Sequence, residues 1–231
     1  MSDVGKAFKA AFGRPEPETP SGVTFTSSFF RDRWKRLHRE VRSGWFEDRF
    51  LYLFGEGLGR LEACLAAWSF LVPPNGDRQV LGYNAHGSLL VLHDANTPEA
   101  SVHVLDPFRV AYWTNPNLAF VNLIGHWLPE DQLPHFRERA VYDAWRAKSG
   151  GPLDEGEILA PRRPEGLGGA FALDNFQEEE IVSFYETTAP IYARAFEQMG
   201  RPRPGAGPPA PATRPPPAPR QRPARGRKGR S

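Results

Sequence analysis

The chain has 231 residues, with 29 Lys and Arg against 27 Asp and Glu, and one cysteine. Hydrophobic residues make up 40% of it, enough to build a core, so a wholly disordered chain is excluded. One cysteine excludes an internal disulfide and a cysteine-rich zinc site, and no apolar run reaches the roughly 20 residues of a membrane helix. Residues 1–14 lack the apolar core of a secretory signal, so we expect a cytoplasmic protein.

Residues 1–22 end in a proline-rich stretch and show no apolar period, which predicts a disordered, flexible leader. Residues 23–44 contain a predicted basic amphipathic helix at 28–42, capped by Ser28, in which apolar side chains recur at helical spacing. Two interpretations of its basic face remain open: a surface for phosphate or anionic lipid, and, favoured here, a solvated face of a docked helix. That face carries Arg31, Arg33, Lys35, Arg36 and Arg39.

Residues 45–200 carry the strand signals. Three short runs rich in Val and Leu are separated by turn residues, at Gln79–Asn84, Ser88–His93 and Ser101–Asp106. A fourth strand is expected at Phe108–Trp113. Short turns between neighbouring strands predict an antiparallel meander.

Helices are predicted after the strands. One opens at Asn115, a second surrounds Phe136–Trp145, and a third follows a capping box at Asp174–Gln177 with Glu178–Glu180 in its first turn. This order predicts the α+β class, with an antiparallel sheet of about four strands covered by helices in one acidic domain, residues 45–200. The predicted core includes Trp68, Leu90, Leu92, Val102, Val104, Leu123, Trp145, Phe184 and Tyr185.

Residues 201–231 hold 10 prolines, no aromatic residue and no acid, which predicts a disordered, basic, Pro/Arg-rich tail. A sharper interpretation makes the tail an arm for nucleic acid or a proline-motif ligand. By contrast, residues 45–200 hold 11 basic and 22 acidic residues. An acidic body favours basic partners and resists direct binding of nucleic acid.

Catalytic motifs are largely missing. The sequence has no Gly-x-Ser-x-Gly elbow and no Gly-Lys-Ser/Thr, and the glycines at 55–59 fit a turn before a helix as well as a nucleotide loop. His93 and His103 could approach across a hairpin, although hydrogen-bonded histidines are commoner than zinc ligands. Cys64 is expected to be a core residue. We therefore expect no enzyme activity, no catalytic residues, no metal and no cofactor.

Four short motifs occur in order: Gly82–Gly87 (GYNAHG), Leu105–Pro107 (LDP), Leu167–Gly169 (LGG) and Asp174–Phe176. With these motifs, residues 47–199 resemble a bacterial family of unknown chemistry, the C-terminal domain of immunity proteins that protect type VI secretion bacteria from their own DNase toxins. Better-studied members carry a preceding domain similar to part of glutamyl-tRNA amidotransferase, which we do not expect in residues 1–44 because they are too short for it. The resemblance supplies no catalytic residues.

The expected function is that of a non-catalytic binding protein, an immunity protein that neutralises a co-encoded antibacterial toxin. A nucleic-acid-associated protein that uses its basic arms, and an unrecognised enzyme, are the alternatives. Because nuclease clefts are basic, acidic loops are the expected contacts. Two loops provide them, one with Glu130 and Asp131 and one with Asp154, Glu155 and Glu157.

Overall fold

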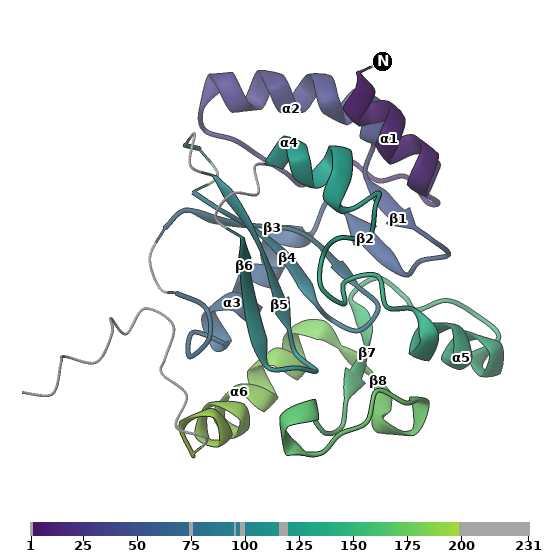
Figure 1. Cartoon of the computed structure of the whole chain (residues 1–231), viewed down its shortest axis with the longest axis vertical. Helices are drawn as coiled ribbons and strands as arrows, with labels where there is room; N and C mark the ends of the chain where they lie inside the picture. Colours follow the sequence, from purple (N-terminus) through teal and green to yellow (C-terminus); the bar gives the residue numbers. More distant parts are fainter. Residues whose placement is uncertain (1, 74–75, 95, 98–99, 116–119, 199–231) are drawn as a thin grey trace, which may run out of the picture.

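The computed structural model describes residues 2–73, 76–94, 96–97, 100–115 and 120–198. Six antiparallel strands form the main sheet as a meander, in the order of the chain (Figure 1). The α+β class is confirmed, but the sheet has six strands rather than about four. Its strands are β1 (Gly44–Phe46), β2 (Leu51–Leu53), β3 (Arg78–Asn84), β4 (Leu89–His93), β5 (Ser101–Asp106) and β6 (Ala111–Asn115).

Six helices and a second, two-stranded antiparallel sheet complete the described fold. The small sheet pairs β7 (Glu157–Pro161) with β8 (Phe176–Glu180). The helices are α1 (Asp3–Phe12), α2 (Ser28–Val41), α3 (Glu62–Ala67), α4 (Phe120–Asn122), α5 (Ala140–Ser149) and α6 (Ile181–Gln198). Shorter helical turns are η1 (Leu58–Leu61), the π-turn η2 (Leu123–Trp127), η3 (Glu165–Leu167) and η4 (Leu173–Asn175).

Helices cover both faces of the main sheet. One apolar cluster joins Leu90 and Leu92 of β4 to α1 and α2, and the other joins Leu89 and Val91 to α3 and α6. All four side chains are fully buried, because successive strand residues point to opposite faces and neither face is open to water.

The predicted core is confirmed at eight of its nine positions, each at most 2% exposed. The exception is Trp145, which is half-buried because its indole N–H reaches the surface and donates to Glu178 Oε1 at 2.9 Å. A fully buried indole needs a partner for this N–H, as Trp68 finds in the backbone oxygen of Tyr185 at 3.0 Å.

The prediction of a flexible leader over residues 1–22 is wrong. Ser2 caps α1 by accepting a hydrogen bond from Gly5 N, and Phe8 is fully buried. Beyond α1, the chain reaches the sheet through isolated bridges, one of which joins Glu18 to Gly44. A domain boundary at 44/45 is also wrong, since β1 begins at Gly44. The tail predicted for residues 201–231 lies outside the described residues.

Two helix starts also differ from prediction. Residues 176–180 are not the first turn of a helix but strand β8, in which Glu178 pairs with Leu159. The helix α6 begins after them, where Glu180 Oε2 accepts a hydrogen bond from Ser183 N at 2.8 Å. The helix predicted from Asn115 has its described part in α4 and η2, from Phe120 to Trp127.

Alternate turns of a meander lie at the same end of the sheet. The β1–β2, β3–β4 and β5–β6 turns, residues 47–50, 85–88 and 107–110, therefore gather at one end, which we call the turn end. The described residues of the β4–β5 connection, 94, 96–97 and 100, lie at the opposite end beside α2 and α4.

Candidate functional site

The motif residues Asn84 and Asp106 close two turns of the turn end. The buried Asn84 Oδ1 accepts hydrogen bonds from His86 N at 3.0 Å and Ser88 N at 2.9 Å. Asp106 Oδ1 likewise accepts from the backbone N–H of Phe108 at 2.9 Å. Short side chains that satisfy nearby backbone donors favour tight turns. These two residues therefore explain why both motifs lie at the ends of strands.

The distal motif shapes a neighbouring loop. Gly168 has φ +83°, a conformation that favours glycine, and Gly169 lies so close to Arg163 O that a Cβ there would clash. Asn175 then ties the loop together, accepting from Arg163 N at 3.1 Å and donating to Arg163 O at 2.8 Å. The loop thus depends on backbone geometry that these residue types provide.

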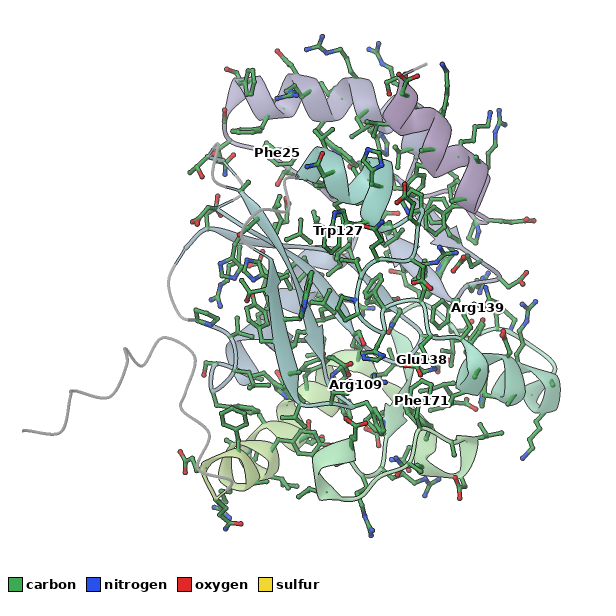
Figure 2. All side chains as sticks on the ribbon, viewed as in Figure 1. Phe25, Arg109, Trp127, Glu138, Arg139 and Phe171 are labelled. Carbon is green, nitrogen blue, oxygen red and sulfur yellow. The ribbon has the colours of Figure 1, made fainter. Side chains whose placement is uncertain are left out.

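An arginine joins the turn end to the segment before α5. Arg109 forms ion pairs with Asp106 at 3.0 Å and with Glu138 at 2.8 Å, and its guanidinium lies over the ring of Phe171 at 5.6 Å (Figure 2). Burial disfavours the charge on Arg109, but the two carboxylates outweigh it and raise the pKa of the guanidinium. This arginine therefore stays charged while it is mostly enclosed.

His86 is 3% exposed and contacts the same Phe171 ring as Arg109. Its ring packs against three phenylalanines at centroid distances of 5.1 to 5.5 Å, and its Nε2 has no hydrogen-bond partner among the described residues. Burial, reinforced by the positive charge of Arg109, lowers the pKa of His86 to about 3. The ring is therefore neutral at physiological pH.

The β1–β2 turn has an unusual backbone. Three successive non-glycine residues, Glu47, Asp48 and Arg49, have φ angles of +51°, +58° and +65°. Each such left-handed residue costs about 1 kcal/mol or more, so the surroundings must hold the turn in place. Arg139 Nη1 donates to Glu47 O at 2.9 Å, and the Tyr142 hydroxyl donates to Asp48 O at 2.5 Å.

Ion pairs extend this turn into a network. Arg137 pairs with the Glu47 carboxylate, Arg146 with Asp48 at 3.1 Å, and Arg139 with Asp143 at 3.0 Å. A polar groove of about 690 Å³ runs beside the turn. Its lining includes Phe12, Arg14, Glu16, Trp45, Asp48, Arg49 and Arg146. The turn end therefore presents charged groups on a backbone fixed from behind by arginines.

One predicted acidic loop lies next to this turn. Asp154 is exposed and its Oδ1 lies 4.0 Å from Arg49 Nη1, and Glu155 is also exposed. Glu157 differs, because it is half-buried and its Oε2 accepts a hydrogen bond from Asp154 N at 3.1 Å. Glu157 therefore holds the loop, and only Asp154 and Glu155 are available to a partner.

The other acidic loop is connected to the same turn through Arg137. Arg137, the partner of Glu47, also donates to Pro129 O at 3.4 Å, immediately before the exposed Glu130 and Asp131. Glu130 is engaged by Gln132 Nε2 at 2.6 Å. The structure thus links both predicted groups to residues 47–50, one through Arg49 and the other through Arg137.

The residues that connect the two loops are not among those predicted from the sequence. Sequence offers one signal for them, the alternating Arg137-Glu138-Arg139, in which the arginines face the β1–β2 turn and Glu138 faces Arg109.

The histidine pair lies elsewhere on the sheet, among hydroxyl groups. His93 and His103 sit on diagonal positions of β4 and β5, with ring centroids 4.3 Å apart. Tyr112 Oη lies 2.6 Å from His93 Nε2, and hydroxyls of Ser101 and Thr114 flank His103. Within the described ranges, no group of three or more His, Cys, Asp or Glu side chains could hold a metal ion.

Other predicted features have structural roles. Gly57 has φ +79° and caps η1, so the glycine-rich stretch forms the turn that leads into α3. Cys64 is fully buried, and burial raises the pKa of its thiol to about 12, as expected for a core residue. The predicted helix at 28–42 is confirmed as α2, with Trp34 and Val41 buried, but the predicted cap is wrong, since Ser28 is the first helical residue and Ser27 holds the N-cap position.

Comparison with known proteins finds a fold but no family. No family model and no curated protein matches the chain. Among solved structures, the crystal structure of Atu4351 from Agrobacterium tumefaciens matches with a TM-score of 0.55 at 13% identity, over 80% of this chain and 87% of that one. This likeness shows a shared fold alone. No helix in the part of the chain that the structure describes is long and apolar enough to cross a bilayer.

Proposed function

We propose that this chain is a non-catalytic, cytoplasmic binding protein that neutralises a co-encoded antibacterial toxin, as in the type VI secretion immunity family that its motifs resemble. The partner is a basic protein, such as a DNase, and its contact surface is the turn end with the two flanking acidic loops.

One observation carries this proposal. Two acidic loops that are distant in sequence, at 130–131 and 154–155, flank one turn whose three left-handed residues are fixed by Arg137 and Arg139. A rigid scaffold that carries exposed acids loses little entropy on binding and presents a complementary field to a basic cleft. Backbone strain held in place by surrounding groups is also frequent at functional sites.

The charge balance of the body supports the same partner. Residues 45–200 hold twice as many acidic as basic residues, 22 against 11. Steering by such a field speeds encounter with a cationic surface and weakens as salt increases.

A survival assay tests the proposal. The product of the neighbouring gene is expressed in cells with and without this chain, and we expect growth only when the chain is present. Cells that die equally in both cases would contradict the proposal for that partner.

Charge reversal then tests the surface. Asp154→Lys with Glu155→Lys should reduce protection, while Glu157 is left unchanged because it holds the loop. Glu62→Lys with Glu186→Lys is the matched control, since these exposed acids lie on α3 and α6, outside the turn end and its two acidic loops. Equal protection by both double variants would remove the turn end from the proposal.

A further inference from the structure

A second surface lies at the opposite end of the sheet. A groove of about 960 Å³ opens between α2, the β4–β5 connection and α4, near Phe25 in Figure 2. Its floor is apolar, since it consists of Phe25, Phe30, Leu37, Leu92, Ala100 and Phe120. Pockets of this size with an apolar lining and a few polar groups at the rim are typical binding sites.

The floor of the groove is fixed by ring contacts. Phe25 is 6% exposed and lies 6.2 Å from Phe30 and 6.0 Å from Phe120, measured between ring centroids. Leu92 at the base belongs to β4 and is fully buried. The groove is therefore part of the folded sheet and not a gap between loose side chains.

The lip of the groove is apolar and basic. Phe29 is 60% exposed, an unusual position for a phenylalanine, and the Arg33 guanidinium lies 5.1 Å from the centroid of its ring. Arg33 and Arg36 line the groove, and the adjoining face of α2 adds further cations. The carboxylate of Glu40, at the end of the lip, accepts hydrogen bonds from Ser2 N and Ser2 Oγ, so it is already engaged.

We propose that this groove binds an amphipathic helical segment of a partner protein, with apolar anchors three or four residues apart and acidic residues along its flank. Helix-in-groove recognition uses such anchors, and the arginine lip supplies the complementary charge. This occupant is independent of the toxin contact at the turn end and can be tested without a toxin.

Charge disfavours the tail and a second copy as occupants, and the shape of the groove disfavours a bilayer. Residues 201–231 carry 9 basic residues and no acid, so the tail has the same sign as the lip. In a two-fold symmetric contact, a second copy of the chain would bring its own Arg33 and Arg36 to the same lip. A bilayer would have to enter a recess, because the apolar floor at Phe25 and Leu92 is buried whereas Phe29 alone stands exposed.

Selection from a displayed library of random peptides, each about 16 residues long, against the full chain tests this proposal. We expect enriched peptides that are acidic and have Phe, Leu or Trp at helical spacing. Phe29→Glu should weaken their binding at least about tenfold, measured by fluorescence anisotropy. The substitution removes the exposed ring and places a negative charge against the acidic peptide. The matched control is Ile191→Glu on α6, where Ile191 is 59% exposed, and it should leave binding unchanged.

Several results would overturn the proposal. They are a selection without enrichment, enrichment of basic peptides, and peptides that bind the Phe29→Glu variant as tightly as the unaltered chain. Sedimentation with phosphatidylcholine–phosphatidylglycerol vesicles gives the last test, and vesicle binding that Phe29→Glu abolishes would assign the groove to lipid instead. Circular dichroism of the variants checks that the fold is retained.

Discussion

The two ends of the sheet differ in how they are held and in what they present. At the turn end, charged side chains fix a left-handed backbone, and Arg137 and Arg139 are mostly enclosed against Glu47. At the groove end, aromatic rings form the floor, and the arginines of α2 stand at the lip over Phe29. Arginine is therefore structural at one end and available for recognition at the other.

This difference teaches that counting charges along the chain is not enough. Residues 1–44 hold 9 basic and 5 acidic residues, and the fold packs their helices α1 and α2 onto one face of an acidic body. The charged side chains at the turn end largely pair with one another. Only the outermost acids, such as Asp154 and Glu155, are therefore free to contact a partner.

The largest expected effect separates the two uses of arginine. Arg137→Ala leaves the enclosed Glu47 carboxylate with only its longer contact to Arg139 Nη1, at 3.9 Å, and we expect a loss of about 2–3 kcal/mol in the free energy of unfolding, discounted for partial exposure. Arg33→Ala, at the groove lip, should change it by less than about 0.5 kcal/mol. Urea denaturation measures both, and equal losses would show that the turn end is not held by its ion pairs.

A second contrast lies in pH. Burial and the charge on Arg109 hold the pKa of His86 at about 3, below the ordinary value of 6.5 for histidine, so the folded chain binds fewer protons than the unfolded chain between these pH values. The contribution of the neutral His86 ring to the free energy of unfolding is fully present above pH 6.5. As pH falls below this value, the contribution decreases by up to about 1.4 kcal/mol per pH unit.

His86→Phe should flatten this loss, measured by urea denaturation at several pH values. The same replacement at His126, whose side chain is 65% exposed, serves as the control. A slope that stays unchanged in the His86 variant would show that protons are taken up elsewhere.

A smaller effect of opposite sign is expected from glycine. Arg49 has φ +65° and only a distant ion pair with Asp154, so Arg49→Gly should stabilise the fold by about 0.5 kcal/mol. In the helix α2, Arg33→Gly should destabilise it by about 1 kcal/mol. Thermal melts of the two variants should shift in opposite directions, and a shift in the same direction would contradict the strained-turn account.

Much of the sheet could be predicted from the sequence because most of its strands have a clear local sequence pattern. Val- and Leu-rich runs separated by turn residues marked β3 to β6, although the fourth strand begins at Ala111 rather than Phe108. The strands β1 and β2 are not predicted because each has only three residues and the turn between them contains no glycine. The left-handed backbone at the three turn positions is one that glycine adopts most readily.

The remaining errors have two different origins. The three glutamates at 178–180 resemble a helix start, but pairing with β7 overrides that local preference. In α1, Phe8 and Phe12 stand four residues apart and Ser2 precedes them as a cap, a signal that the prolines further on obscured. For the candidate site, sequence located the acidic loops, but only the fold could show that they flank one turn and that Glu157 is engaged.

The most direct test of the turn end as a binding surface is the association rate of the chain with the product of the neighbouring gene, measured by stopped-flow fluorescence from about 50 to about 300 mM salt. Asp154→Lys with Glu155→Lys should slow association and flatten its salt dependence, with the melting temperature nearly unchanged, whereas Glu62→Lys with Glu186→Lys should do neither. If the turn-end variant associates as fast and with the same salt dependence as the unaltered chain, the acidic loops do not contact the partner and the central claim is wrong.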